Sequence, residues 1–184
     1  MSRQKELITH LFRLVHVARS VGMKCALTAV DSDPALNFWR LILGNQLDIA
    51  VIEWCKVFGS YGEPTHWKNI VPAKNHDQFR RDLLEGLGIT PEALNDYWTE
   101  MKKYRDTLAA HHIELKKPDK RPVLDLALKS SCFYYRYLIK ELRSQGVTNY
   151  PDDLDAYATK FEEQAREIAK EAMTATAKLK ESVF

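Results

Sequence analysis

An arginine and two nearby histidines are the side chains in this sequence best suited to acid–base chemistry on a phosphate ester. Arg105 is followed by His111 and His112. The imidazole of histidine has an unperturbed pKa of about 6.5, so it can remove or deliver a proton near neutral pH. Arginine stays charged and binds phosphate through a planar fork, which stabilises charge in a transition state. The residue types therefore predict Arg105 as a phosphate-stabilising group and one histidine as a general acid or base.

The identity of that histidine depends on the geometry of the predicted helix from about Pro91 to His112. Successive residues of an α-helix are 100° apart, so Arg105 and His112 share a face while His111 points about 120° away. His111 reaches Arg105 only if the helix frays or turns. Both histidines stay candidates, and we expect His111 to be the active one because a helix that ends near Ala110 frees it.

Further charged residues surround the pair. Asp106 is adjacent to Arg105 and is expected to support it. A basic loop after the histidines could hold the backbone of an RNA strand through its four cations, Lys116, Lys117, Lys120 and Arg121. Neighbouring residues on a helix point apart and no His-Glu-x-x-His spacing is present, so we expect no metal site and no cofactor.

The segment 105–111, Arg-Asp-Thr-Leu-Ala-Ala-His, resembles the motif of the HEPN superfamily: arginine, commonly a polar residue, and histidine a few residues later. That superfamily consists of compact helical bundles, often dimeric, and many members are metal-independent endoribonucleases of toxin–antitoxin, abortive-infection and other defence systems. The resemblance implies catalytic Arg105 and His111, a supporting Asp106, a homodimer with a shared cleft, and RNA and a cognate antitoxin as partners. The doubled histidine departs from the motif and keeps His112 as an alternative.

A second class of function fits the same residues. In a non-catalytic interaction module, or in an RNA- or nucleotide-binding protein, Arg105 and a histidine would form a structural pair. A solvent-open cleft around them favours catalysis, whereas a sealed ion-pair network favours the structural role. The other basic pairs are interpreted as solvated faces, Arg80-Arg81 and Lys102-Lys103, and four further histidines as structural, His10, His16, His66 and His76.

Helix signals account for nearly the whole chain. Asp33-Pro34 and Thr90-Pro91 each place a capping residue before a proline, and Pro122 and Pro151 open the last two helical segments. Apolar residues recur every three or four positions, whereas strand-like alternation is absent. The sequence predicts an all-α, HEPN-like single domain over residues 1–184, a bundle of five to six mostly antiparallel helices.

Two predicted helices carry unusual apolar surface. The segment 36–58 is apolar on nearly all sides, which is typical of the centre of a bundle or of an oligomer interface. Within it, Asn45 and Asp48 are expected to form a buried hydrogen-bonded pair or to contact Arg105. The C-terminal helix, 151–182, is expected to pack on the bundle or in a dimer interface along a heptad-like seam that includes Leu154, Ala158, Phe161, Ala165 and Ile168. Residues 59–74 contain two glycines and two prolines and are predicted to form a long loop.

Composition limits the setting rather than the activity. The chain has 184 residues, of which 45% are hydrophobic, and its net charge of +2 favours no class of partner. Cys25, Cys55 and Cys132 lie in apolar contexts and are expected to be free core thiols in a reducing compartment. No segment has the pattern of a signal peptide or is apolar enough to span a bilayer, so we expect a cytoplasmic protein that does not bind membranes.

Overall fold

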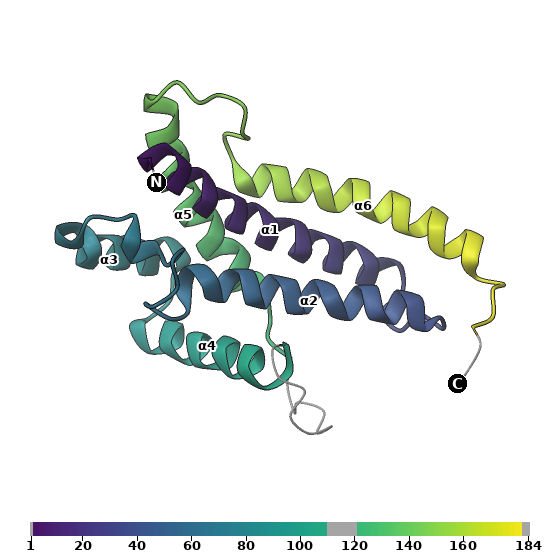
Figure 1. Ribbon diagram of the computed structural model, residues 1–184. Helices are drawn as coiled ribbons and strands as arrows, with labels where there is room; N and C mark the ends of the chain where they lie inside the picture. Colours follow the sequence, from purple (N-terminus) through teal and green to yellow (C-terminus); the bar gives the residue numbers. More distant parts are fainter. Residues whose placement is uncertain (1, 110–120, 182–184) are drawn as a thin grey trace.

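The computed structural model describes residues 2–109 and 121–181 and consists of α-helices and short turns (Figure 1). Within these ranges there is no strand, so the all-α prediction is confirmed. Six α-helices follow one another as α1 Arg3–Val30, α2 Asn37–Phe58, α3 His76–Leu87, α4 Pro91–Tyr104, α5 Asp125–Ser144 and α6 Leu154–Thr176. The predicted loop between α2 and α3 contains two 3₁₀ turns, η1 Trp67–Asn69 and η2 Ala73–Asn75, and a π-helical turn, η3 Arg105–Ala109, follows α4.

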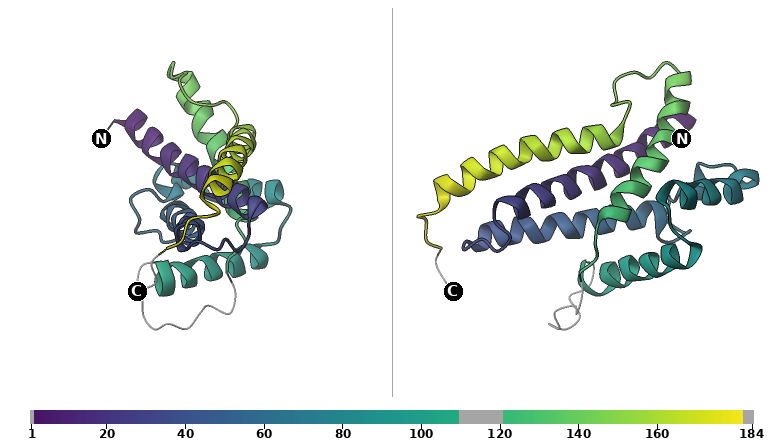
Figure 2. Two further views of the ribbon diagram at one scale, coloured as in Figure 1. Left: turned by 90° about the vertical axis from the view of Figure 1, so that its right-hand side faces the viewer. Right: turned by 180° about the vertical axis from the view of Figure 1, so that it is seen from behind.

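The helices α1, α2 and α6 run side by side along the length of the molecule (Figures 1 and 2). α1 and α2 form an antiparallel hairpin, and α2 and α4 are also antiparallel (Figures 1 and 2). α6 packs along α1 in the same direction, because α5 first crosses the hairpin and returns the chain to the end where α1 begins. The prediction of mostly antiparallel neighbours therefore holds for α1, α2 and α4 and fails for α6.

Helix starts show which capping signals were sufficient. Thr90 Oγ1 accepts a hydrogen bond from the backbone N–H of Ala93 at 3.2 Å, as its position before Pro91 predicts. Asp33-Pro34 does not cap α2, which begins three residues later without a capping side chain from its own segment. Instead the carboxylate of Glu181 accepts the backbone N–H groups of Asn37 and Phe38 at 2.6 and 2.7 Å. The first turn of α2 is thus completed by a residue distant in the sequence.

Large aromatic side chains fill the centre of the bundle. Trp54 is 1% exposed, and Tyr134 and Tyr135 of α5 are fully buried. The hydroxyl of Tyr134 lies 3.0 Å from Nδ1 of His10, which is therefore a satisfied core histidine as predicted. The predicted seam of α1 is buried as well, at Leu7, Leu11, Leu14, Ala18 and Val21.

Several predicted burials are wrong. Cys25 is exposed, whereas Cys55 and Cys132 are buried. Ile168 of α6 is 68% exposed, because the helix buries a stripe through Ala158, Ala165 and Ala169. That stripe follows the 3.6-residue period of a straight helix, which drifts away from a heptad seam. α6 also starts and ends inside the predicted range 151–182.

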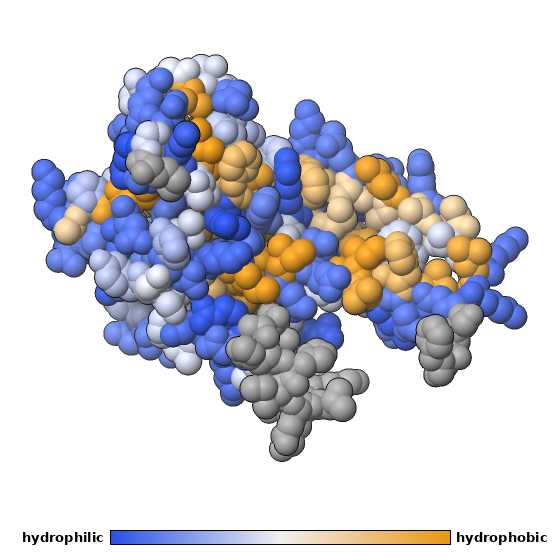
Figure 3. Space-filling model, in the orientation of Figure 1, coloured by the Kyte–Doolittle hydropathy of each residue, from blue (hydrophilic) through white to orange (hydrophobic). Residues whose placement is uncertain are grey.

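Apolar surface remains open on the hairpin. Phe38 and Leu41 of α2 are 56% and 64% exposed, while the C-terminal half of the same helix is buried. Figure 3 shows apolar surface gathered where α1, α2 and α6 run side by side. None of the helices in the described ranges combines the length and apolar character needed to cross a membrane.

Candidate functional site

The chain around Arg105 does not continue as an α-helix. α4 ends at Tyr104 and passes into the π-helical residues Arg105–Ala109, which we call the arginine turn. π-helical segments are rare in proteins, but those that occur are often found at functional sites. The straight-helix geometry that placed His112 beside Arg105 therefore does not apply. Both histidines and most of the predicted basic loop lie outside the described residues, namely His111, His112, Lys116, Lys117 and Lys120.

Arg105 is held by its neighbour in the sequence. Its Nε donates a hydrogen bond to Oδ1 of Asp106 at 2.7 Å, and this bond raises the pKa of the guanidinium. The Arg105 side chain is 18% exposed and that of Asp106 is 54% exposed. Within residues 2–109 and 121–181, Nη1 and Nη2 of Arg105 have no hydrogen-bond partner. Asp106 thus orients one edge of the guanidinium.

A tyrosine fastens the arginine turn to α2. The Tyr104 hydroxyl donates a hydrogen bond to Oδ1 of Asp48 at 2.7 Å. Burial and then this bond raise the pKa of Tyr104, and the charge of the exposed Arg121 opposes the rise. Asn45 is exposed, so the predicted buried pair of Asn45 with Asp48 is wrong. Asp48 acts on the turn through Tyr104.

The charge of Arg105 acts on the buried thiol of Cys55. Burial raises the pKa of Cys55 to about 12, and the neighbouring charge of Arg105 only partly opposes this rise. At neutral pH the thiol therefore stays protonated and inert. In the described part of the chain, no group of three or more His, Cys, Asp or Glu side chains could hold a metal ion.

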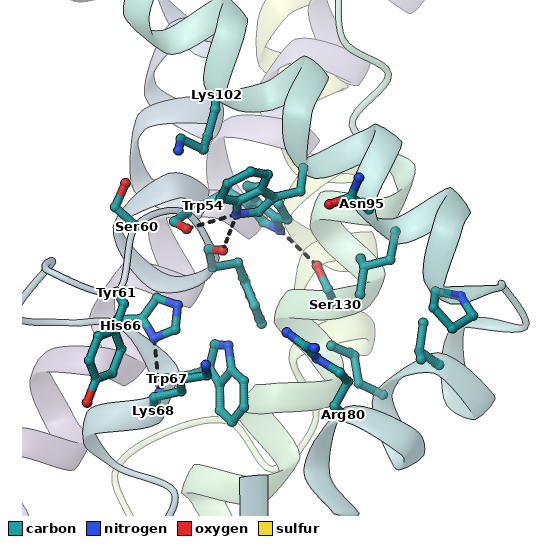
Figure 4. Close-up of a pocket in the computed structure, with 17 residues that line it drawn as sticks. Trp54, Ser60, Tyr61, His66, Trp67, Lys68, Arg80, Asn95, Lys102 and Ser130 are labelled. Carbon is teal, nitrogen blue, oxygen red and sulfur yellow. Dashed lines mark hydrogen bonds between the residues drawn. The ribbon is translucent and has the colours of Figure 1, made fainter. Parts of the chain in front are cut away.

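One helical turn before Arg105, α4 borders a pocket of about 550 Å³ (Figure 4). Tryptophans from three elements line it: Trp54 of α2, Trp67 of η1 and Trp98 of α4. Lys68, Arg80 and Lys102 also line it, and the lining residues include no carboxylate. We call this the tryptophan pocket, defined by these six residues.

Hydrogen bonds fix two of the indoles. Trp98 Nε1 donates to the carbonyl oxygens of Phe58 and Gly59 at 2.9 and 2.8 Å, and Trp54 Nε1 donates to Ser130 Oγ at 2.9 Å. Trp67 is stacked on Phe79, with ring centroids 4.6 Å apart. The indole N–H groups are therefore satisfied within the protein, and the rings are held before any ligand arrives.

Two lysines lie over these rings. Lys102 Nζ is 4.1 Å from the centroid of the Trp98 ring, and Lys68 Nζ is 5.7 Å from that of Trp67. Of the pair interpreted as a solvated face, Lys103 is exposed and Lys102 is half-buried. Cation–π attraction holds each ammonium close to an aromatic surface without neutralising its charge.

His66 belongs to the wall of this pocket. It is 5% exposed, and its Nδ1 accepts the backbone N–H of Lys68 at 3.2 Å. Burial and then the charge of Lys68 lower the pKa of His66 to about 4. The ring is neutral at pH 7, and since Nδ1 accepts a hydrogen bond, its own proton is on Nε2.

The tryptophan pocket as a whole was not predicted, because its walls come from segments far apart in the chain. The spacing of Trp98 and Lys102, one turn apart on α4, was a local signal for it. Comparison with known proteins adds nothing to this geometry, since no protein-family model, no curated protein and no solved structure matches the chain.

Proposed function

We propose that this protein is a HEPN-type, metal-independent endoribonuclease that cuts single-stranded RNA in the cytoplasm. The observation that carries the proposal is the setting of Arg105. Its half-buried side chain belongs to a π-helical turn, its guanidinium is oriented by Asp106 at 2.7 Å, and two of its nitrogen atoms make no hydrogen bond to the described residues. An arginine held in this way can bind a phosphate through its remaining N–H groups.

The proposed reaction uses the ribose of the substrate as nucleophile. His111 removes the proton of a 2′-hydroxyl, whose oxygen attacks the adjacent phosphorus while Arg105 stabilises the charge on the non-bridging oxygens. The bond from phosphorus to the 5′-oxygen breaks, and a protonated histidine supplies a proton to that oxygen. The products are a 2′,3′-cyclic phosphate and a 5′-hydroxyl. Lys116, Lys117, Lys120 and Arg121 would bind the backbone of the strand.

We expect the active form to be a homodimer, since the resemblance to HEPN proteins implies that two copies of the motif share one cleft. A second copy could also supply the histidine that protonates the leaving group. The exposed Phe38 and Leu41 of α2 offer apolar surface for such an association. A role in defence with a cognate antitoxin follows from the same resemblance.

A second candidate function has the same fold but no catalytic activity. In a non-catalytic interaction or RNA-binding module, Arg105 would only stabilise the turn, and the 2.7 Å pair with Asp106 suits that role as well. The two functions differ in whether RNA is cut.

The decisive experiment is a cleavage assay on end-labelled single-stranded RNA in the presence of EDTA. Wild-type protein should cut the RNA and leave 2′,3′-cyclic phosphate ends, and Arg105→Ala should abolish cutting. Arg136→Ala is the matched control, because Arg136 is an exposed arginine on the distant α5. Helical content by circular dichroism should be the same in all three proteins. Cutting that requires magnesium, or that survives Arg105→Ala, would leave the non-catalytic module as the better description.

A further inference from the structure

The tryptophan pocket has a chemistry that RNA cleavage at Arg105 does not use. Its walls are flat aromatic rings and its charged side chains are all cations, Lys68, Arg80 and Lys102. None of these three makes an ion pair with a carboxylate of residues 2–109 or 121–181. A volume of about 550 Å³ is in the range of pockets that hold small organic ligands.

We propose that the tryptophan pocket binds a nucleoside phosphate, with the base against the accessible rings of Trp98 and Tyr61 and the phosphate at the cationic side chains that line the pocket. The proposal is independent of cleavage by Arg105. It applies equally to a free nucleotide and to a nucleotide within a single strand, because both present the same base and phosphate.

The aromatic walls account for the base. Trp98 is half-buried and is fixed through its Nε1 to the carbonyl oxygens of Phe58 and Gly59, so its ring needs no reordering on binding. The buried Trp54, fixed to Ser130, supports the pocket from beneath. The phenol ring of Tyr61, which is 66% exposed, lies at the edge of the same pocket. Indoles that are fixed in place are suited to stacking with a nucleobase, and such stacking tolerates any base.

The cations account for the phosphate. Lys102 and Lys68 lie over rings of the pocket, at 4.1 Å from Trp98 and 5.5 Å from Tyr61, and Arg80 of α3 approaches from another wall (Figure 4). An uncharged aromatic ligand would leave three cations without an anionic partner, and a cationic ligand would be repelled. A planar ligand that carries a phosphate can contact the aromatic rings and also pair with the cationic side chains.

Neutral hydrogen-bonding groups are available for the remaining polar edge of such a ligand. The Nε2–H of His66 can donate, and Ser60 and Asn95 contribute a hydroxyl and an amide to the lining. His66 can only donate, whereas the Ser60 hydroxyl and the Asn95 amide both donate and accept, so the set fits a base or a ribose without demanding one base.

The position of the pocket relates it to the arginine turn. Lys102 and Arg105 are three residues apart on consecutive helical turns, a rise of about 4.5 Å along the axis. A strand that placed one base in the pocket could therefore extend its backbone toward Arg105. The test distinguishes this source of the nucleotide from a free one.

The experiment is a titration of the full chain followed by tryptophan fluorescence and confirmed by calorimetry. The ligands are the four ribonucleoside 5′-monophosphates, adenosine, and a 2′-O-methyl pentanucleotide, which lacks the 2′-hydroxyl needed for cutting. We expect a monophosphate to bind at least tenfold more tightly than adenosine, and its affinity to fall with added salt.

Paired variants locate the binding. Lys102→Gln and Arg80→Gln should each weaken binding of the phosphate ligand about tenfold, because each removes one charge-assisted contact. Lys103→Gln and Arg81→Gln are the matched controls, since they change exposed neighbours outside the pocket and should leave affinity unchanged. Because each pair removes the same charge, a difference within a pair reports position rather than net charge.

Two outcomes support the proposal and separate its sources. If monophosphates bind and compete with the pentanucleotide, the pocket accepts a free nucleotide; if only the pentanucleotide binds and Lys102→Gln weakens it, the nucleotide belongs to a strand. Equal affinities of Lys102→Gln and Lys103→Gln, or no binding of any phosphate ligand, would overturn the proposal. Failure of RNA cleavage alone would not overturn the proposal. The pocket is proposed to bind independently of Arg105, so Arg105→Ala should keep wild-type affinity for the monophosphate.

Discussion

The arginine turn and the tryptophan pocket both lie along α4, yet they are built in opposite ways. The turn depends on contacts close in sequence, Arg105 with Asp106, and on one bond from Tyr104 to α2. The pocket depends on bonds that join residues about 40 and 76 positions apart, Trp98 with Phe58 and Trp54 with Ser130. The turn can therefore be altered without disturbing the bundle, whereas the pocket is part of the core.

The largest effect should come from the histidines proposed to act with the arginine turn. Loss of a general acid or base slows a reaction about 10²- to 10⁴-fold, so His111→Ala should reduce RNA cutting by that amount. His112→Ala should have a smaller effect. Single-turnover cleavage assays measure the loss of activity in the two variants. Nucleotide titrations of the same variants check that the pocket is unaffected. A large loss in His112→Ala instead would transfer the catalytic role to that residue.

Low pH should lower the stability of the protein through two buried histidines, His66 in the pocket wall and His10 in the bundle core. Burial lowers the pKa of His66 and His10 to about 4, below the value of about 6.5 in the unfolded chain. The unfolded state then takes up protons first, so the free energy of unfolding should fall between about pH 6.5 and 4, by on the order of 3 kcal/mol per histidine. Urea unfolding across this range should give a shallower pH dependence for His66→Gln than for wild type. His16→Gln, at an exposed position, should behave as wild type.

Self-association should matter to the turn and not to the pocket. If the exposed end of α2 forms the dimer contact, Leu41→Ser removes apolar burial of about 1.5–3 kcal/mol per copy. We expect light scattering to show twice the monomer mass for wild type and the monomer mass for the variant. RNA cutting should fall with the dimer while nucleotide affinity is kept. A monomeric wild type that cuts RNA fully would remove the shared cleft.

The smallest effect should come from the bond that fastens the turn. Tyr104→Phe removes the hydrogen bond to Asp48, which is worth about 1 kcal/mol, or about 2–4 °C in melting temperature for a chain of this size. Tyr150→Phe is the control, since its hydroxyl makes no hydrogen bond in the described part of the chain. Equal melting temperatures for the two variants would mean that the bond contributes nothing to stability.

The sequence predicted features that depend on neighbours along the chain. The spacing of Leu7, Leu11 and Leu14 placed the buried face of α1, and Thr90-Pro91 placed the start of α4. It could not predict the π-helical turn, because the apolar period alone assumes 3.6 residues per turn throughout.

Features made by distant residues were missed for the same reason. Trp54, Trp67 and Trp98 gave no sign of meeting, because their separation in the sequence exceeds any helical period. The segment 36–58 matched α2, but its predicted cap at Asp33 was wrong, because the capping carboxylate comes from Glu181. Local periodicity therefore located the helices but not the pocket.

The cap on α2 has a consequence for the order in which the chain becomes stable during synthesis. The N–H groups of Asn37 and Phe38 donate to the carboxylate of Glu181, which lies 144 and 143 residues further along the chain. At about 5–20 residues per second, a ribosome needs roughly 7–30 s to add that length. During that interval the hairpin of α1 and α2 can form, but the first turn of α2 lacks its final partner. The last bond of an early helix is thus made only after α3 to α6 have been translated.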